Sequence, residues 1–283
     1  MRKLSREEFD YLSLLAEGKE QEKTIPASLD NDCVNNGAIT AKGLSLLEPY
    51  RAKRAIFLAA GLGSRMHPIT VNIPKPMVKV HGKRIIETSL EAVIAAGIQE
   101  IYIIRGYLGE TFDLLLKKYP MIKFIENEEY IGTGTIASVF RARNLLSNAY
   151  VIESDIVIND PSVIKKYHYR SDYMGASVTE TDDWYLKTDD EGKIIDIGVN
   201  SSGENLYKLA GISYWDSEAG EKLKIDLENA YSAENGKKLS WSKIPFILNK
   251  EHYCAEIMPC QLNDVTEIDS FKELQEYDST YCC

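Results

Sequence analysis

Short apolar runs alternate with amphipathic stretches between residues 54 and 153. The run 54–60 (RAIFLAA) has the length and composition of a buried parallel strand. Similar runs and the periodic stretches between them predict strands over 100–104, 122–126 and 149–153, and helices over 84–96, 109–119 and 135–146. Strands that alternate with helices favour an α/β fold with a mostly parallel sheet, whose ligands bind beyond the carboxyl ends of the strands.

The pattern changes after Asp155, where alternating residues dominate. It predicts β segments over 175–181, 184–188, 193–199 and 208–215, with a hairpin turn at 189–192. Helices over 217–231 and 241–248, a late strand at 256–258 and a final helix at 271–277, capped by Ser270, complete the chain. We expect this β-rich half to belong to the same domain as the parallel strands.

Residues 1–52 differ from the rest and predict a small separate element. Ser5 and Glu8 form a capping box before a helix that extends to about Leu15, and a second apolar stretch covers 39–49. The two pieces resemble the first helix and the last wing and helix of a winged helix-turn-helix. The segment between them is too short for a turn and a recognition helix, which disfavours DNA binding. We predict a packing or dimerisation role for 1–52, and one large domain over 53–283.

Composition narrows the functional class. The chain has 283 residues, 44% hydrophobic and 27% charged, with a net charge of −10 and a pI near 5.1. These values are typical of globular proteins and disfavour a nucleic-acid-coating surface. No apolar run is long enough to span a membrane, and the first residues lack an apolar signal core. Five cysteines without a C-x-x-C spacing are typical of free thiols, so we expect a cytoplasmic protein.

The most informative stretch is 58–76, LAAGLGSRMHPITVNIPKP. Gly61 and Gly63 allow backbone N–H groups to approach an anion, and Arg65 adds a planar cation. Lys75 lies between two prolines, Pro74 and Pro76, which stiffen the backbone around it. The spacing matches neither a dinucleotide fingerprint nor a P-loop. It predicts a rigid site for phosphate groups.

Acidic residues at two places could hold a metal ion. Asp155 follows the strand predicted at 149–153, at the edge where ligands bind, and could hold Mg²⁺ against phosphate oxygens. Glu267 and Asp269 would lie on one face of an extended segment. From the residues alone, either site could instead be a cap or a turn.

These segments together resemble a known family. LAAGLGSR and the later PKP are similar to the signature of nucleotidyltransferases that make nucleoside-diphosphate sugars and alcohols. From Lys53 onward the chain resembles bacterial CTP:phosphocholine cytidylyltransferases of the licC type, most strongly in DDWYL (182–186) and EIDS (267–270), and also in AGISYWD (210–216) and LSW (239–241). The resemblance implies a Rossmann-like nucleotidyltransferase fold with a β-rich acceptor half; some bacterial members also carry a winged-helix element at the N-terminus.

The resemblance also implies an activity: Mg²⁺-dependent transfer of CMP from CTP to a small phosphorylated acceptor, giving CDP-choline and pyrophosphate for cell-surface modification. Lys75 and Arg65 would be catalytic, and Asp155 with Asp269 would bind Mg²⁺. The enzyme could act as a homodimer, without nucleic acid or membrane. Nucleotide contacts are predicted for Leu58, Ala59, Ala60, Gly61, Gly63, Ser64, Arg65, Lys75, Gly106, Tyr107, Gly132, Thr133 and Ser138.

Aromatic residues of the second half suggest how a choline group would be bound. A quaternary ammonium cannot donate hydrogen bonds, so aromatic faces and carboxylates must hold it. The acidic segments Asp182–Asp183 and Asp216 lie beside several of these rings. The predicted acceptor-binding residues are Trp184, Tyr185, Tyr214, Trp215, Trp241 and Glu267.

Two departures from the choline-type pattern leave the acceptor open. Ser242 follows Trp241 where those relatives carry an acid, and 132–138 (GTGTIAS) replaces their Asn pair. Phosphoethanolamine, 2-aminoethylphosphonate, inositol phosphate or a sugar 1-phosphate are therefore alternatives to phosphocholine. A non-catalytic nucleotide-sensing regulator is the alternative from another functional class.

Overall fold

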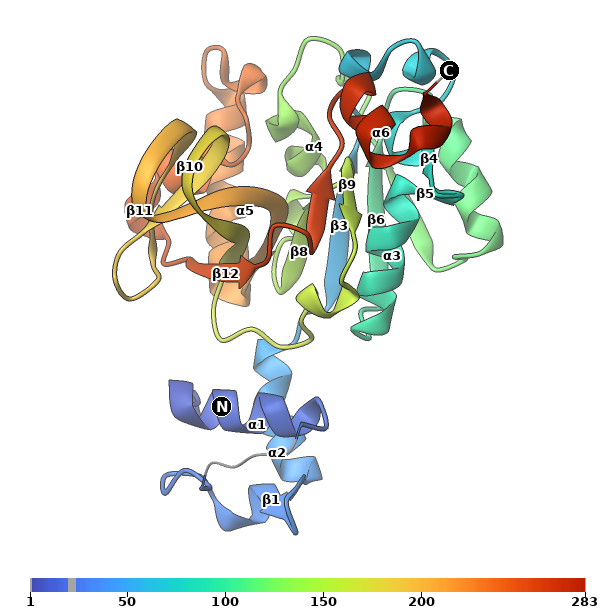
Figure 1. The fold of residues 1–283 in the computed structure, drawn as a ribbon. Coiled ribbons are helices and arrows are strands. Elements are labelled where there is room, and N and C mark those ends of the chain that lie inside the picture. Colours follow the sequence, from blue (N-terminus) through green and yellow to red (C-terminus); the bar gives the residue numbers. More distant parts are fainter. Residues whose placement is uncertain (1, 20–23, 283) are drawn as a thin grey trace. The chain divides into compact units, whose positions relative to one another are not determined.

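The computed structural model describes residues 2–19 and 24–282, which form two compact units. The first unit consists of Met1–Arg51 together with Lys166–Tyr169, and the second of Ala52–Lys165 together with Arg170–Cys283. Figure 1 shows the secondary structure of each unit. None of the described helices is long and apolar enough to cross a membrane.

The first unit is small and mainly helical. It contains helix α1 (Arg6–Ala16), a short hairpin of β1 (Val34–Asn35) and β2 (Ala38–Ile39), and helix α2 (Ala41–Leu47). The predicted capping box is present, because Ser5 accepts from the Glu8 N–H while Glu8 accepts from the Ser5 N–H. Phe9 packs against Tyr50 and Tyr169, which gives the unit its own apolar core.

The segment between α1 and the hairpin bears on the regulator alternative. Its described part, residues 24–33, contains a single 3-10 turn, Asn31–Cys33, and no α-helix. Winged helix-turn-helix proteins read DNA with a recognition helix in this region. The described residues of this unit therefore lack the element that would enter a DNA groove.

The second unit is built on a seven-stranded sheet with the strand order β12-β10-β11-β8-β3-β6-β7. Its strands are β3 (Arg54–Ala59), β6 (Glu100–Arg105), β7 (Ile122–Glu126), β8 (Ala149–Glu153), β10 (Asp172–Thr188), β11 (Ile194–Trp215) and β12 (Glu256–Cys260). The pairs β8–β3, β3–β6, β6–β7 and β10–β12 are parallel, and only β11 runs antiparallel to its neighbours. The predicted α/β fold with a mostly parallel sheet is confirmed.

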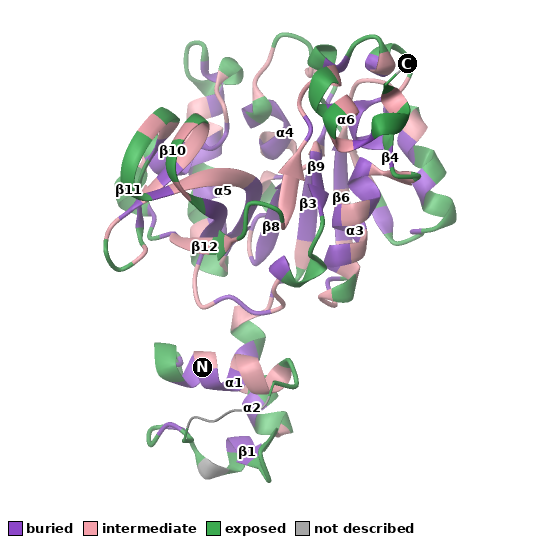
Figure 2. Ribbon diagram, viewed as in Figure 1, coloured by how far each residue is buried: buried purple, intermediate pink, exposed green. Residues whose placement is uncertain are grey.

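The central strands have continuous apolar sequences because their alternate residues pack on opposite faces of the sheet, and both faces are covered. In β3, Ala55 and Phe57 pack in one apolar cluster, while Ile56 packs in a second cluster. Successive side chains of a strand point to opposite faces, so the two clusters cover the two faces of the sheet. Figure 2 shows the central strands largely buried and much of the outer β10–β11 ribbon exposed. A strand that is buried on both faces needs apolar side chains at successive positions, which explains the continuous apolar run 54–60.

Helices α3 (Ile85–Ala95), α4 (Thr135–Arg141), α5 (Ser217–Ser232) and α6 (Phe271–Tyr277) lie close to their predicted positions. Two predicted helices have a different geometry. Residues 109–119 form a 3-10 helix, Gly109–Lys117, and 241–248 contain a π-helical turn, Ile244–Leu248. The predicted helix 135–146 ends at Arg141 and continues as a 3-10 turn, Arg143–Leu145.

Strands β10 and β11 correct the predicted four short segments. Each is one long strand, and the polar positions between the predicted segments are absorbed as bulges near Thr181–Trp184 and Val178–Glu180. Leu186 pairs with both Ile197 and Tyr207, so the far end of β10 lies between two parts of β11. Because these polar residues pair with the neighbouring strand, they form parts of β10 and β11 instead of the loops that were predicted.

Two small sheets complete the unit: the hairpin of β4 (Lys79–Val80) with β5 (Lys83–Arg84), and β9 (Ile156–Ile158) with β13 (Val265–Glu267). The β9–β13 sheet is antiparallel and pairs Glu267 with Ile156. The Ile268 N–H also donates to the Asp155 carbonyl at 3.0 Å. This register brings the acidic segment near the C-terminus to the end of β8.

Candidate active site

The loop after β3 forms one wall of the site. Gly63 has φ 61°, a left-handed conformation that glycine adopts without strain. A Cβ atom at this position would lie 2.9 Å from Cβ of Lys75 and 3.3 Å from Cγ2 of Thr70. A glycine is therefore needed here for the loop to pack against the segment that carries Lys75.

Lys75 is buried between two carboxylates. Its side-chain Nζ donates to Oδ2 of Asp155 at 2.9 Å and to Oδ1 of Asp269 at 2.6 Å, and the residue is 7% exposed. Burial alone would lower the pKa of Lys75, but the attraction of the two acids outweighs it and raises the pKa above its ordinary value. The lysine is therefore a fixed cation in a buried position.

Arg65 approaches the same acid from the solvent side. Its Nη1 lies 2.7 Å from Oδ2 of Asp269, and its Nη2 lies 3.0 Å from Oδ1. This two-point contact fixes the orientation of a guanidinium whose side chain is otherwise largely exposed. Arg65 and Lys75 thus meet at Asp269, which is 204 and 194 residues away from them in the sequence.

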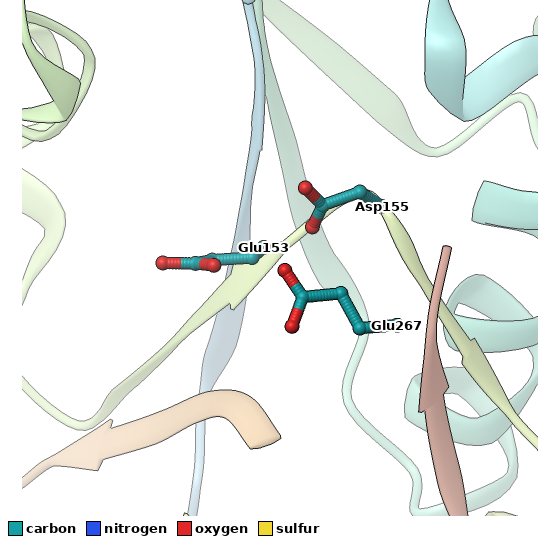
Figure 3. A group of neighbouring side chains, drawn as sticks. All are labelled: Glu153, Asp155 and Glu267. Atoms are coloured by element: carbon teal, nitrogen blue, oxygen red, sulfur yellow. The ribbon is translucent and has the colours of Figure 1, made fainter. Parts of the chain in front are cut away.

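Two further carboxylates join Asp155 at the end of β8. One ligand oxygen each from Glu153, Asp155 and Glu267 lies within 4.8 Å of the others. Figure 3 shows the carboxylates of Asp155 and Glu267 beside one another, with Glu153 extending to one side. Burial, reinforced by Asp155 and Asp269, raises the pKa of both Glu153 and Glu267 above the ordinary range of a carboxyl group.

These carboxylates fit a Mg²⁺ ion. Mg²⁺ prefers hard oxygen ligands and is usually held by one or two carboxylates together with substrate phosphates. Oδ1 of Asp155 is buried and has no hydrogen-bond partner among the described residues. An unpartnered buried carboxylate oxygen is costly unless it meets a cation. Asp155 and Glu267, whose carboxylates lie beside one another, are thus candidate ligands of a metal ion, and Glu153 is the third member of the group.

The two acids near the C-terminus differ from their predicted positions. Glu267, predicted to bind the acceptor, lies in the carboxylate cluster. Asp269, predicted to bind Mg²⁺, is engaged by Lys75 and Arg65 and lies outside that cluster. The metal role of Asp269 stays a prediction, and Glu267 becomes a second candidate ligand.

Two adjoining pockets of about 190 and 380 Å³ are lined by Asp155, the smaller one also by Glu153 and the larger one also by Asp269. They share Leu58, Gly61, Tyr130, Thr133 and Asp155. Other predicted nucleotide residues line one or the other, namely Ala59, Ala60, Gly63, Ser64, Arg65, Lys75, Gly132 and Ser138. The structure thus brings the two glycine-containing segments, 58–65 and 132–138, to one cavity beside the acids.

Gly106 and Tyr107 are the exceptions among the predicted nucleotide contacts. Neither is among the lining residues of the two pockets. The Tyr107 hydroxyl donates to the carbonyls of Thr70 and Val71 at 3.0 and 2.9 Å, so the side chain ties two loops together. Gly106 lies against the ring of Tyr130. Both residues support the pocket wall.

Several lining residues were not among the predicted contacts, including Tyr130, Glu153 and Ser154. Asn127 is buried at the end of β7 and donates to the Ser138 hydroxyl at 3.1 Å. Glu153 lies two residues before Asp155, and it is the only charged residue of β8. A charge at the end of an otherwise apolar strand was the signal that could have identified it.

Three of the aromatic residues that were predicted to bind the acceptor as an aromatic cage are buried in the structure, which corrects that prediction. Tyr214 and Trp215 are 0% exposed, and Trp241 is 1% exposed. Trp215 packs edge-on against Trp241 with 5.8 Å between ring centroids, and its Nε1 donates to the Ser213 hydroxyl at 3.0 Å. Trp215 and Trp241 belong to one apolar cluster and Tyr214 to the other, so none of the three rings offers a face to a ligand.

The other two aromatic residues of the cage, Trp184 and Tyr185, lie on β10 and are half-buried. The Tyr185 hydroxyl donates to Oδ2 of Asp196 at 2.7 Å, while Trp184 packs against the same core cluster as Trp215. Neither lines the two pockets described above. Their role in binding the acceptor stays a prediction from the sequence.

Replacing Trp215 with leucine is expected to destabilise the fold. The change removes ring contacts to Trp241, Tyr253 and Phe246 and leaves a cavity, which should lower the free energy of unfolding by about 2–4 kcal/mol. Chemical denaturation measures this loss. A cage residue would instead raise the acceptor KM at unchanged stability, and that result would contradict the core assignment. Trp184→Leu serves as the half-buried comparison.

Comparisons with known proteins agree with this geometry. The sequence model described as nucleotidyl transferase matches residues 54–238. A 2-aminoethylphosphonate cytidylyltransferase of Lancefieldella rimae is 34% identical over 80% of this chain and 92% of its own. A choline-phosphate cytidylyltransferase of Streptococcus pneumoniae is 31% identical over 79% of this chain and 97% of its own.

Solved structures give the same result for the fold. The CTP:phosphocholine cytidylyltransferase of Streptococcus pneumoniae superposes with a TM-score of 0.75 at 32% identity, covering 81% of this chain and 99% of that one. The inositol-1-phosphate CTP transferase of T. maritima superposes with a TM-score of 0.65, covering 82% of this chain and 95% of that one. At 16% identity the second match supports the fold alone. The resemblance predicted from the signature and the acidic segments is confirmed.

Proposed function

The chain belongs to the nucleotidyl transferase family, and we propose that it transfers a cytidylyl group from CTP to a small phosphorylated or phosphonate acceptor. The observation that carries this proposal is the position of Lys75. Its ammonium touches Asp155 and Asp269 and lines the pocket formed by the loop after β3. A buried cation between acids, facing a glycine loop, suits the phosphate groups of a nucleotide better than a neutral ligand.

The reaction needs no covalent enzyme intermediate. An anionic oxygen of the acceptor forms a bond to the α-phosphorus of CTP, while the bond from that phosphorus to the bridging α–β oxygen breaks. The electron pair leaves with pyrophosphate. Because the attacking oxygen is already anionic, catalysis consists of positioning and of stabilising charge on the transferring group.

The residues divide this work. A lysine ammonium has three donors, and Lys75 uses two of them on Asp155 and Asp269. We assign the third to a nonbridging oxygen of the α-phosphate. Arg65 and the backbone of Gly61–Ser64 would hold the β- and γ-phosphates. Asp155, with Glu267 or Asp269, would hold Mg²⁺, which neutralises phosphate charge when it is bound.

The pocket beyond Leu58 is the proposed position of the base. Asn127 and Ser138 lie at its wall and are hydrogen-bonded to one another, so an amide and a hydroxyl face a nucleotide there. The choice of CTP rests on the relatives. Phosphocholine and 2-aminoethylphosphonate, the acceptors in the names of two of them, are the first candidates for the second substrate.

Pyrophosphate release over a grid of nucleotides and acceptors tests the proposal. We expect turnover with CTP to exceed that with UTP, dTTP and ATP by at least about ten-fold, with Mg²⁺ and either an amino-alcohol phosphate or an aminophosphonate. A discrimination of this size corresponds to about 1.4 kcal/mol, within reach of one or two polar contacts to the base. Preferred use of UTP or dTTP with a sugar 1-phosphate would contradict it.

A further inference from the structure

The ion pairs of the site leave two carboxylates without a cation. Lys75 forms ion pairs with Asp155 and Asp269, and Arg65 forms a second ion pair with Asp269. Neither Glu153 nor Glu267 makes a hydrogen bond or an ion pair with a side chain of residues 2–19 or 24–282. The Glu153 side chain extends to one side (Figure 3), and one of its oxygens lies within 4.8 Å of ligand oxygens of Asp155 and Glu267. A metal ion held by Asp155 and Glu267 alone would leave the Glu153 carboxylate without a cation.

Glu153 lies where the two halves of the domain meet. It is the last residue of β8, opposite Leu58 of β3 on one side. On the other side lies β11, where an ideal Cβ at Gly211 would be 3.2 Å from Cβ of Glu153 and 3.5 Å from its Oε2. Gly211 has φ 70°, so this position resists replacement by a larger residue. The carboxylate therefore lines the pocket proposed for the base, at the boundary with β11, so a group bound to Glu153 would lie beside the base.

The surroundings of Glu153 do not suit a quaternary ammonium. Such a cation needs several aromatic faces, because it has no N–H to donate. Tyr130 is the one aromatic residue among those that line the two pockets. The rings of Trp215 and Trp241 are committed to the core. A primary ammonium has three N–H donors, for which an unpartnered carboxylate is the natural acceptor.

We propose that the acceptor carries a primary ammonium group and that Glu153 binds it, so that Glu153 is a specificity-determining residue for the second substrate. This inference rests on the proposed cytidylyl transfer and names the class of its acceptor: a two-carbon amine with a phosphate or phosphonate at the other end. The ammonium neutralises Glu153, while the anionic end lies toward Lys75 and the metal ligands. Both charges of the acceptor then meet opposite charges of the site.

The rival role for Glu153 is to bind the ribose hydroxyls of the nucleotide. A carboxylate accepts from hydroxyls as well as from ammonium groups. The electrostatics favour the ammonium. A neutral ribose would leave the negative charge of Glu153 without a compensating positive charge, next to the carboxylates of Asp155 and Glu267. The two roles change different kinetic constants, so they can be separated.

The test compares three acceptors that differ only at the amine end: 2-aminoethylphosphonate, its N,N,N-trimethyl derivative and propylphosphonate. The corresponding phosphate esters replace them if the enzyme uses only esters. For the parent enzyme we expect kcat/KM for the primary amine to exceed that for the other two by about ten-fold or more. In Glu153→Gln this preference over propylphosphonate should fall by about 10- to 100-fold, with the KM for CTP changing less than three-fold. Glu180→Gln, an exposed glutamate on β10, is the matched control and should keep the preference.

Three results would overturn the inference: a parent enzyme that prefers the trimethyl acceptor, an equal loss for all three acceptors in Glu153→Gln, or a rise in the CTP KM as large as the loss for the amine. Calorimetric titration of 2-aminoethylphosphonate and propylphosphonate, with a non-hydrolysable CTP analogue, provides a readout that does not depend on turnover. Absence of CTP-dependent pyrophosphate with every acceptor would contradict the proposed function, whereas turnover without amine preference would contradict only the role of Glu153.

Discussion

Replacing Lys75 with alanine should lower kcat by about 10²–10³-fold. Removal of one preorganised donor to a developing anion typically costs about 2.7–4 kcal/mol in the transition state. Lys75 is held by Asp155 and Asp269, so it does not have to reorganise during the reaction. Steady-state pyrophosphate release at saturating CTP and Mg²⁺ measures the effect. Lys79→Ala, an exposed lysine four residues away, is the matched control and should retain the parent rate.

The burial of Lys75 adds a structural consequence to this prediction. Without the ammonium, two carboxylates face each other, and breaking a buried ion pair is generally destabilising. Thermal unfolding with and without Mg²⁺ separates this effect from the loss of catalysis, because a bound cation would partly replace the missing charge. Near-parent turnover in a folded Lys75→Ala protein would remove the lysine from the mechanism.

The second large effect is expected at the metal ligands. Asp155→Asn keeps the shape of the side chain but removes a hard anionic ligand, so the Mg²⁺ concentration for half-maximal rate should rise by roughly ten-fold or more and kcat should fall. Direct titration with Mn²⁺, followed by electron paramagnetic resonance, measures metal binding without turnover. An Asp155→Asn enzyme that titrates with Mg²⁺ like the parent would refute this assignment.

The same titration decides between the two acids near the C-terminus. If Glu267 is the second ligand, Glu267→Gln should shift the Mg²⁺ dependence as Asp155→Asn does. If Asp269 acts through its contacts with Lys75 and Arg65, Asp269→Asn should lower kcat at an unchanged Mg²⁺ midpoint. A shifted midpoint in Asp269→Asn would instead support the metal role that the sequence resemblance implies.

Local signals explain why much of the first half was predictable. The strands at 122–126 and 149–153 have the bounds that their apolar runs indicate. The capping boxes at Ser5 and Ser270 depend on a residue three positions away, so a short stretch of sequence contains all the necessary information. The same holds for the turn at Gly63 and for the prolines around Lys75.

Predictions were weakest where distant segments compete for the same residues. Trp184 and Trp215 lie in similar sequences, each beside an acid, yet one is half-buried on a ribbon and the other is at the centre of the core. An aromatic ring in an alternating segment can pack inward or line a site, and the choice depends on which neighbours cover that face. That information lies in the contacts to Trp241, Phe246 and Tyr253, which are remote in the chain.

The sequence by itself therefore determined the sheet with its parallel strands, the glycine-containing loop after β3 and the lysine held between two prolines, because each depends on short-range geometry and on repeating burial. Tertiary structure alone decided which acids meet. The antiparallel register of β9 with β13 brings Glu267 to Asp155, and the packing of β11 beside β8 places Gly211 against Glu153. Pairing register is set by long-range packing, and a shift of one residue would reverse which side chains face the cavity.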